Sequence, residues 1–451
     1  MKLLIEDRFL IMSFDSPEEE RLVKDAFTFD DMSATFLGGK FDKRKIKKKC
    51  LVRNLGQYMV LPSGFLLDLM RLIKTDPHIS LKELTDKRTK FSHQSKDVPS
   101  QELKNLFPAK FKYINHQINS LRAMLKTSWG IIEAPTSSGK SETIIAYIKA
   151  TRLPTLIVVN RINLAMQLKD RLCENGIQAG IACTNQFIPA PVMVATIGSV
   201  GKVTLTQFQV LIIDECHRAQ ARTFQNFLKV FLPPIRFGFS ATPDGGDKYK
   251  FALIKQYLGE VIYKVNIKEL LENEVIAKPK ISFIRNTAQP AVSWATSYLS
   301  GIVFNYQRNN KIREMVEKHN LQTMILVRII DHGKELANSI PNSIFVSGID
   351  DPVYRKQVIE DFEKGDLKVI ISSNIFNEGI SINAIKLLII ASGGKSKIET
   401  IQKLGRGLRI RPDKNEVLVY DFDDIGNMFT ERHSQMRKNI YEKAGFEILE
   451  Q

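Results

Sequence analysis

Short apolar runs alternate with segments of helical length along most of the chain after residue 105. Each run is rich in apolar and β-branched residues, which is typical of a strand buried on both faces. The runs are residues 156–159, 192–196, 210–213, 236–240, 324–327, 369–372, 387–390 and 417–420. Strands separated by crossover helices form parallel sheets, and residues 105–425 are too many for one such sheet. The pattern therefore predicts an α/β protein with two parallel-sheet lobes.

The first hundred residues show a more mixed pattern. Residues 60–74 read as a turn followed by an amphipathic helix, and the basic run 43–49 reads as a strand or hairpin that leads into the apolar residues 50–52. The polar stretch from Thr85 to Gln101 is expected to be a linker. We therefore expect a small N-terminal α/β module before the two lobes.

Composition places the chain among ordinary folded proteins. Of its 451 residues, 43% are hydrophobic and 25% are charged, which argues against disordered and fibrous classes. No apolar run approaches the roughly 18 residues of a membrane span, and the acidic and basic residues 6–8 interrupt the apolar start before a signal-peptide core could form. The four cysteines form no CxxC pair, which argues against zinc sites and disulfides. We expect a cytoplasmic protein without a membrane partner.

The net charge of +16, from 65 Lys and Arg against 49 Asp and Glu, indicates a polyanionic partner. The charge is uneven, because residues 1–31 hold nine acids and four bases whereas residues 40–53 hold eight bases and one acid. Lysines gathered on one element release counterions when they bind phosphates, so this run is a candidate DNA contact; a solvated face is the alternative. The candidate residues are Lys43, Arg44, Lys45, Lys47, Lys48 and Lys49.

A strand-loop-helix segment has a phosphate-binding pattern. The apolar run 129–133 is followed by a loop that matches GxxxxGK[ST], except that Ala replaces the first Gly, and then by a helical pattern. Backbone N–H groups at the helix start would wrap the phosphates, Lys140 would hold the β and γ phosphates, and Ser141 would ligate Mg²⁺. The residues expected to bind ATP here are Ala134, Pro135, Thr136, Ser137, Ser138, Gly139, Lys140 and Ser141.

Two carboxylates follow another predicted strand. Asp214 and Glu215 come directly after the run 210–213, at the carboxyl end of a parallel strand, where α/β sheets bind ligands. We expect Asp214 to hold Mg²⁺ through water and Glu215 to polarise the attacking water. Together with Lys140, the pair predicts a catalytic site for phosphoryl transfer.

A third strand ends in small hydroxyl residues. Ser240 and Thr242 could hydrogen-bond the region of His217, which follows the two carboxylates, and so couple this region to the state of the nucleotide.

Near the far end of the chain, Arg406 and Arg409 are three residues apart, so they would lie on one helical face. That spacing suits arginine fingers that reach the γ-phosphate from a second domain. A basic helix face is the alternative.

In their order along the chain, these segments resemble the motifs of superfamily 2 nucleic-acid helicases. The resemblance implies two RecA-like lobes of the P-loop NTPase type that sandwich ATP and Mg²⁺. It also implies that Gln117 reads the adenine and that Gly379 and Gln402 lie at the nucleotide. The residues implied in contacts with the nucleic-acid backbone are Arg161 and Thr196.

Shorter segments outside these motifs resemble the UvsW branch-migration helicases of tailed phages. They are the segment 38–65, the pair Arg308-Asn309 and residues 393–397. The resemblance implies that the N-terminal module binds DNA and that the substrate is branched DNA, such as forks, Holliday junctions and R-loops, in phage replication, recombination and repair. Lys395 and Lys397 would then contact phosphates.

The implied organisation has four parts. They are an N-terminal accessory DNA-binding module at 1–100, a first RecA-like lobe at 101–277, a second at 278–426 and a C-terminal helical tail at 427–451. Simple packing on the second lobe is the alternative role for the tail. We expect a monomer, in the host cytoplasm if the chain is phage-encoded.

Three other functions stay open at this stage. A translocase could remodel DNA without unwinding it, a basic annealing protein could use ATP only to switch its affinity, and an RNA helicase would share the same motifs. The motifs alone do not separate DNA from RNA motors.

Overall fold

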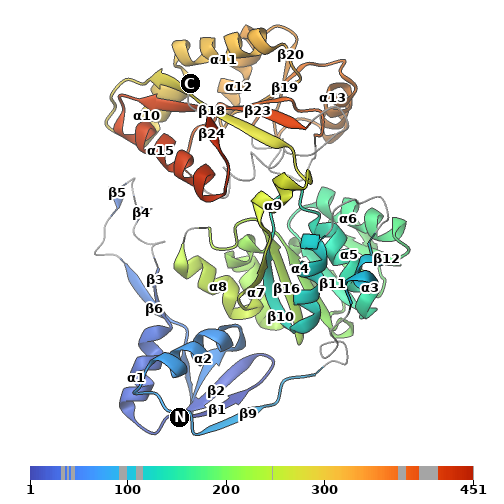
Figure 1. Ribbon diagram of the computed structural model, residues 1–451, viewed down its shortest axis with the longest axis vertical. Helices are drawn as coiled ribbons and strands as arrows, with labels where there is room; N and C mark the ends of the chain where they lie inside the picture. Colours follow the sequence, from blue (N-terminus) through green and yellow to red (C-terminus); the bar gives the residue numbers. More distant parts are fainter. Residues whose placement is uncertain are drawn as a thin grey trace. The chain divides into compact units, whose positions relative to one another are not determined.

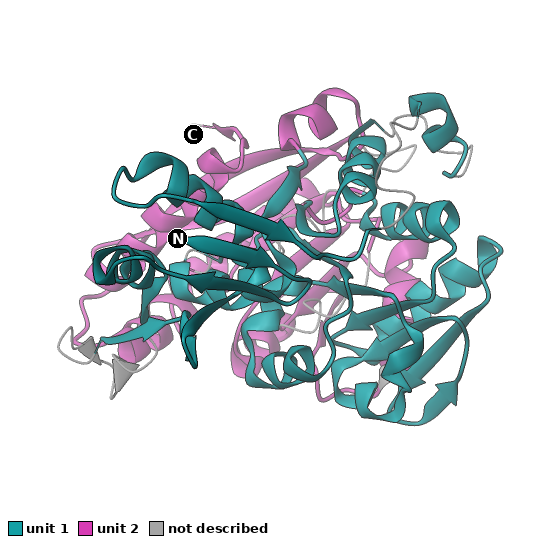
Figure 2. Cartoon of the chain, turned by 90° about the horizontal axis from the view of Figure 1, so that it is seen from below, with its two compact units in different colours: residues 1–134, 139–265 teal, residues 135–138, 266–451 magenta. Residues whose placement is uncertain are grey.

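The computed structural model describes residues 1–31, 36–37, 40–41, 46–90, 99–107, 115–245, 247–373, 382–395 and 415–449. The chain divides into two units (Figure 2), of which the first comprises residues 1–134 and 139–265 and the second comprises residues 135–138 and 266–451. Among the described helices, none is both long enough and apolar enough to cross a bilayer.

The first unit begins with a small α/β module (Figure 1). Its elements are β1 (Lys2–Ile5), β2 (Phe9–Ser13), α1 (Pro17–Ala26), β3 (Thr28–Asp31), β4 (Phe36–Leu37), β5 (Lys40–Phe41), β6 (Lys47–Cys50), β7 (Arg53–Leu55), β8 (Tyr58–Pro62), α2 (Leu66–Thr75) and β9 (Glu83–Asp86). Five strands form one sheet in the order β7-β8-β2-β1-β9, and β3 pairs with β6 outside it. Alternate apolar residues of β1 and β2 are buried on one face, as the period of a strand requires.

A parallel sheet forms the rest of the first unit. Its elements are α3 (Ser100–Lys104), α4 (Asn115–Lys126), β10 (Trp129–Glu133), α5 (Lys140–Thr151), β11 (Thr155–Val159), α6 (Ile162–Glu174), β12 (Ala179–Cys183), β13 (Gln186–Ile188), β14 (Val192–Thr196), β15 (Val210–Asp214), α7 (Arg222–Val230), β16 (Ile235–Ser240), α8 (Lys248–Leu258) and β17 (Val261–Lys264). The strand order is β13-β12-β14-β11-β15-β16-β10-β17, and only the β12–β13 pair is antiparallel.

Helices cover both faces of this sheet, because successive residues of a buried strand point to opposite sides. On β16, Phe237 makes an edge contact with Tyr147 of α5, at 5.3 Å between ring centroids. The next residue, Gly238, lies against Leu258 of α8, where a Cβ would crowd that side chain. Figure 1 shows α4 and α5 on one side of the sheet and α7 and α8 on the other.

The second unit contains another parallel sheet. Its elements are α9 (Ile267–Glu272), β18 (Lys278–Thr287), α10 (Trp294–Tyr298), a π-helical turn (Leu299–Val303), α11 (Tyr306–His319), β19 (Thr323–Leu326), α12 (Ile330–Ser339), β20 (Ser343–Val346), α13 (Pro352–Lys364), β21 (Val369–Ser372), β22 (Leu387–Ile390), β23 (Glu416–Ile425), α15 (Met428–Lys443) and β24 (Ile448–Leu449). The order is β20-β21-β19-β22-β23-β18-β24, and every described pair is parallel.

The two parallel-sheet lobes and the N-terminal α/β module confirm the predicted fold class. All eight predicted runs coincide with strands, although the run 324–327 extends one residue beyond β19. Strand β23 is longer than its apolar run, because Asp421 and Asp424 interrupt the apolar pattern. Both aspartates are buried and paired with arginines, Asp421 with Arg437 at 2.9 Å and Asp424 with Arg308 at 3.1 Å. A buried carboxylate with such a partner can occupy a strand position that the apolar pattern leaves out.

Two boundaries differ from the sequence reading. Strand β9 extends to Asp86, so the stretch expected to be a linker begins as part of the sheet, paired with β1. The C-terminal tail is helical only to Lys443, because Ile448 and Leu449 form β24 and pair with β18.

The N-terminal module packs directly on the first parallel sheet. Ala252 of α8 belongs to the same apolar core as Phe65 and Leu69 of the module. The fully buried Arg236 of β16 donates a hydrogen bond of 2.7 Å to Ser63 Oγ. Because a buried guanidinium needs partners for its donors, this bond ties the module to the strand.

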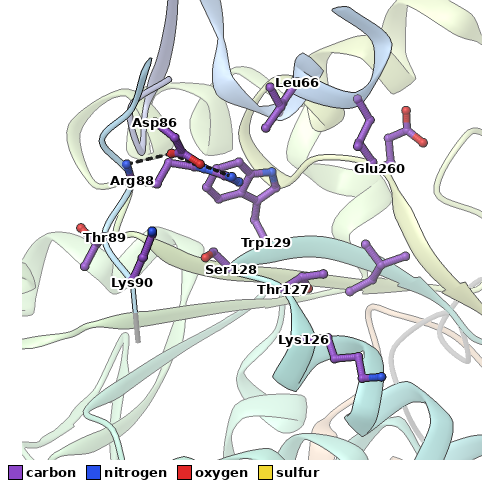
Figure 3. A pocket seen from close by; sticks show the side chains of 13 residues that line it. Leu66, Asp86, Arg88, Thr89, Lys90, Lys126, Thr127, Ser128, Trp129 and Glu260 are labelled. Atoms are coloured by element: carbon purple, nitrogen blue, oxygen red, sulfur yellow. Dashed lines mark hydrogen bonds and ion pairs between the residues drawn. The ribbon is translucent and has the colours of Figure 1, made fainter. Parts of the chain in front are cut away.

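Trp129, the first residue of β10, lies between the two parts. Its ring is 4.4 Å from the Arg236 guanidinium and 5.4 Å from that of Arg88, at the end of the module. Figure 3 shows Arg88 paired with Asp86 beside the indole, at the wall of a cavity of about 330 Å³. These cation–π contacts add to the shared apolar core and the Arg236–Ser63 hydrogen bond that hold the module on the lobe.

A substitution at Gly64 tests the junction between the N-terminal module and the first parallel-sheet lobe. A Cβ at this position would overlap the main-chain carbonyl oxygen of Lys255 in α8, and neither backbone can yield easily. We expect Gly64→Ala to destabilise the first unit by about 1–3 kcal/mol and to loosen the module. Urea unfolding and limited proteolysis measure both effects.

Gly201→Ala is the matched control, because nothing lies within 4 Å of a Cβ there. It should change the free energy of unfolding by less than about 0.5 kcal/mol. Equal unfolding midpoints for the two variants would show that the module is not held at Gly64.

Candidate functional site

Three of the predicted motifs meet at one edge of the first sheet, because β15, β16 and β10 are parallel neighbours. Asp214 ends β15 and Ser240 ends β16, while Ala134 directly follows β10. The Ala134 N–H donates to the Ser240 carbonyl over 2.9 Å. The phosphate loop, the two carboxylates and the hydroxyl strand end therefore share the carboxyl edge, where parallel sheets bind ligands.

The phosphate loop turns sharply before α5. Ser137 and Gly139 have φ angles of 69° and 81°, in the left-handed region that favours glycine. Gly139 also leaves no room for a side chain, because a Cβ there would overlap the amide nitrogen of Gln117. Gln117, the residue predicted to read adenine, thus lies against the loop, and α5 begins at Lys140 with its first N–H groups at the loop.

Lys140 and Glu215 form an ion pair of 3.0 Å inside this edge. Burial opposes the Lys140 charge, but the carboxylates of Glu215 and Asp214 outweigh it and raise the pKa of Lys140. Burial would likewise raise the pKa of Glu215, yet Lys140 and His217 hold it well below its usual range. Both groups therefore stay ionised, as a phosphate-binding ammonium and a water-orienting carboxylate require.

Glu215 has an unusual backbone conformation. Its φ of 52° lies in the left-handed region, which non-glycine residues rarely adopt. Its N–H donates to Asp214 Oδ1 over 3.0 Å, so the strained turn holds the two carboxylates beside each other. Such strain gathers at functional sites and supports a catalytic interpretation of this turn.

A chain of polar contacts continues from Glu215. The Nδ1 atom of His217 lies 3.2 Å from Glu215 Oε2 and 3.1 Å from Ser240 Oγ. The Thr242 N–H donates to the same Ser240 oxygen over 3.2 Å. The structure therefore brings the three residues predicted to couple the site, His217, Ser240 and Thr242, into one network with the Glu215 carboxylate.

Two predicted nucleic-acid contacts also follow strands of this edge. Arg161 comes after β11 and caps α6, and Thr196 ends β14 but is only 6% exposed, which leaves little of its side chain for a ligand. Arg218, which the sequence reading missed, lies close enough to Arg161 that the two like charges interact. Burial and then Arg161 lower the pKa of Arg218, so a phosphate would relieve this repulsion.

The lysines of β6 are exposed, but carboxylates offset two of them. In the β3–β6 pair, Lys47 lies opposite Asp31 and Lys48 opposite Asp30, whereas Lys49 lies opposite Phe29. Side chains directly opposite each other in an antiparallel pair are neighbours. The charge of this run is therefore less concentrated than its sequence indicates.

Other predicted residues lie outside the described part of the chain, and their roles stay predictions. They are Lys43, Arg44, Lys45, Gly379, Lys397, Gln402, Arg406 and Arg409. Lys395 is described and exposed, at the end of the loop that follows β22.

Two family models match the chain. The model described as type III restriction enzyme, res subunit, matches residues 110–245, which contain Lys140, Asp214 and Glu215, and the model described as helicase conserved C-terminal domain matches residues 307–411. Together the two matches span more than half of the chain and follow the order of the predicted motifs. The chain is a superfamily 2 helicase. The helicase is thus an ATP-dependent hydrolase.

Known proteins similar to the helicase include two curated relatives. It is 24% identical over 367 residues to the DNA 3'-5' translocase XPB2 of Sulfurisphaera tokodaii, covering 70% of this chain and 82% of the relative. It is 26% identical over 353 residues to the ATP-dependent DNA helicase uvsW of Enterobacteria phage T4, covering 69% of this chain and 68% of the relative.

Among solved structures, the helicase matches the fold of S. cerevisiae Dbp5 bound to RNA and ADP BeF3, with a TM-score of 0.54 and 16% identity. The match covers 74% of this chain and 88% of that chain.

Removing either member of the central ion pair should stop hydrolysis. We expect Lys140→Ala or Glu215→Gln in the helicase to lower nucleic-acid-stimulated ATP hydrolysis by at least about 10²-fold, because each loses a charge placed for the transition state. Nucleic-acid binding should persist. Lys149→Ala, at the far end of the same helix, is the matched control. Wild-type hydrolysis in either site variant would contradict this site.

Cross-strand pairing predicts unequal effects for the β6 lysines. Lys49→Ala should reduce the slope of log K against log salt for duplex DNA by about 0.9, the value for one phosphate contact. Lys48→Ala should reduce it less, because Asp30 lies opposite that lysine. Fluorescence anisotropy titrations over a range of salt measure both slopes. Unchanged slopes in both variants would make the run a solvated face.

Proposed function

We propose that this helicase unwinds and branch-migrates branched DNA, such as forks, Holliday junctions and R-loops, with energy from ATP, in phage replication, recombination and repair. The observation that supports it best is the continuous network from Lys140 through Glu215 and His217 to Ser240. Such a network would let the state of the phosphates act on a strand end that lies beside the phosphate loop.

The residues of the site have distinct proposed roles. The γ-phosphate would take the place of the Glu215 carboxylate as partner of Lys140, which frees Glu215 to accept a hydrogen bond from the attacking water. His217 would sense that change, because it contacts both Glu215 and Ser240. Hydrolysis would thereby change the hydrogen bonds at Ser240 and Thr242.

The donor set fits Mg²⁺ bound together with ATP. Ser141, the second residue of α5, offers a hydroxyl and Asp214 a carboxylate, and Mg²⁺ usually takes one or two protein oxygens plus phosphates. Burial raises the pKa of Asp214 despite the opposing charge of Lys140, so a cation at this carboxylate would be favourable. When bound, the ion would offset charge on the phosphate oxygens.

DNA as the substrate is supported by the names of the two relatives, a DNA translocase and a DNA helicase. The net charge of +16 suits a polyanion of either kind. By this proposal Arg161, with its neighbour Arg218, and Lys395 contact phosphates, which position a strand without reading its sequence. A monomeric state and a cytoplasmic location stay predictions.

The deciding experiment compares substrates in one assay. ATP hydrolysis would be measured with a four-way DNA junction, a forked duplex, single-stranded DNA and duplex RNA, together with strand separation on labelled forks, junctions and R-loops. We expect the strongest stimulation and ATP-dependent strand separation with branched DNA. Strongest stimulation by RNA would make the protein an RNA helicase.

A translocase is the second candidate, because one relative is named as a translocase. It predicts DNA-stimulated hydrolysis and displacement of a bound protein or third strand without separation of a fork. An annealing protein would instead hydrolyse ATP slowly and pair strands without needing turnover.

The arginine-finger role of Arg409 gives a separate prediction. Arg409→Ala should lower kcat for ATP by about 10³-fold or more, because a finger stabilises charge only in the transition state. Arg411→Ala is the control, since two residues away it would lie on another helical face. A loss of tenfold or less at Arg409 would make this residue structural.

A further inference from the structure

A cavity of about 330 Å³ lies where the N-terminal module meets the first parallel-sheet lobe. Its walls come from α2, from the segment after β9, from the turn between α4 and β10, and from β17 (Figure 3). Trp129 begins β10 and Ile262 is the second residue of β17, and these two strands are parallel. The cavity therefore lies at the amino edge of the sheet, away from the carboxyl edge that holds the phosphate loop.

The charged groups that line the cavity are unevenly paired. Asp86 pairs with Arg88 at 2.6 Å. Glu260 pairs, at 2.7 Å and 3.1 Å, with two cations that do not line the cavity. Lys90 also lines the cavity, and it is exposed and forms no ion pair with any residue that the structure describes. Both lining carboxylates are therefore neutralised, whereas the Lys90 ammonium is not.

A second positive charge lies against the Trp129 ring, which lines the cavity. The Arg236 guanidinium is 4.4 Å from this ring and fully buried. It donates to two main-chain carbonyls and to Ser63 Oγ, but no carboxylate among the described side chains pairs with it. Burial lowers the pKa of Arg236 to about 9, and the charge of Asp7 offsets only part of this. An anion in the cavity would offset more of that charge.

Part of the lining is apolar. Leu66, Leu67 and Ile262 line the cavity together with the Trp129 indole. The Leu67 side chain is 50% exposed, so apolar surface is left uncovered there. A bare inorganic anion would not cover this surface, whereas a molecule with an apolar body would remove it from water. Ligand pockets usually enclose about 300–1,000 Å³ and often lie between domains, so the cavity suits a small organic molecule.

We propose that this junction cavity binds a small organic anion. Its oxyanion group, a carboxylate or a phosphate, lies at Lys90, and its apolar body lies against Leu67 and Ile262. The inference goes beyond the proposed function, because it assigns a ligand that is neither the nucleotide nor a nucleic acid.

Two elements lead from this cavity to the phosphate loop. Near the start of α4, Gln117 lies against the loop residue Gly139, and Lys126, the last residue of the helix, lines the cavity. Strand β10 runs from Trp129 at the cavity to Glu133, one residue before the loop. A bound anion therefore contacts both elements without entering the nucleotide edge, so it binds together with a nucleotide.

The test uses anilinonaphthalene sulfonate, an aromatic anion whose emission rises in an apolar site. In the full chain we expect one saturable site that saturating ADP and Mg²⁺ do not displace. Lys90→Ala should raise the dissociation constant of the dye about 10-fold, because a charge-assisted hydrogen bond is lost. Lys87→Ala is the matched control, since this exposed lysine of the same segment does not line the cavity, and it should leave the constant unchanged.

A second pair of variants tests the apolar contact. Leu67→Ala should raise the dissociation constant about 3-fold or more, because apolar area is lost from the site. Leu84→Ala is its control, since this leucine of β9 is 49% exposed but lies outside the lining. Phenylnaphthylamine, which resembles the dye but lacks its charge, should respond to Leu67→Ala and not to Lys90→Ala.

Competition identifies the oxyanion. Phenyl phosphate or benzoate should displace the dye, and the stronger competitor shows which group the site prefers. The inference is overturned if the wild type has no saturable site, if Lys90→Ala and Lys87→Ala bind the dye equally, or if ADP or single-stranded DNA displaces it. None of these results depends on which nucleic acid stimulates hydrolysis, so the proposed function stands or fails separately.

Discussion

The adjacency of β15, β16 and β10 is the constraint on which the candidate nucleotide site depends. The residues that meet there are distant in sequence, and they come together because parallel strands end at a common edge. The Lys140–Glu215 ion pair forms because these strands are neighbours in the sheet. Each of the two residues requires the other, because an unpaired charge in a buried position is costly. The strained turn at Glu215 is tolerated for the same reason: the sheet and the ion pair both hold it.

Much of the fold could be predicted from the sequence, and so could the meeting of the main candidate site residues at one edge of the first sheet, because both depend on local patterns. Apolar runs of strand length identified the central strands, and the residue types after them pointed to Lys140, Asp214 and Glu215 as candidate site residues, which the structure brings together. What could not be predicted depends on distant partners. Strand β23 continues through Asp421 and Asp424 only because Arg437 and Arg308 pack against them. The cross-strand neighbours of Lys47 and Lys48 likewise depend on a register that composition does not reveal.

Buried arginines are used in both units to fix backbone rather than to add stability. In the first unit Arg236 donates to the main-chain carbonyl groups of Tyr257 and Pro233, and in the second Arg308 and Arg437 donate to carbonyl groups of the loop after β22. A buried ion pair adds little net stability compared with apolar packing, yet removing one partner is strongly destabilising. The guanidinium suits this use because its donors point in fixed directions and can serve a carboxylate and a carbonyl at once.

The shared core of the N-terminal module and α8 has a mechanical consequence. Since Ala252 packs among the module's own apolar residues and Arg236 bonds to Ser63, the module and the first sheet behave as a single body. The β3–β6 pair is attached to that body through contacts of β3 with α8, so a rigid module would hold it at a constant distance from the carboxylates of β15. A nucleic-acid strand bound at this pair of strands would then keep its place relative to the carboxylates of β15.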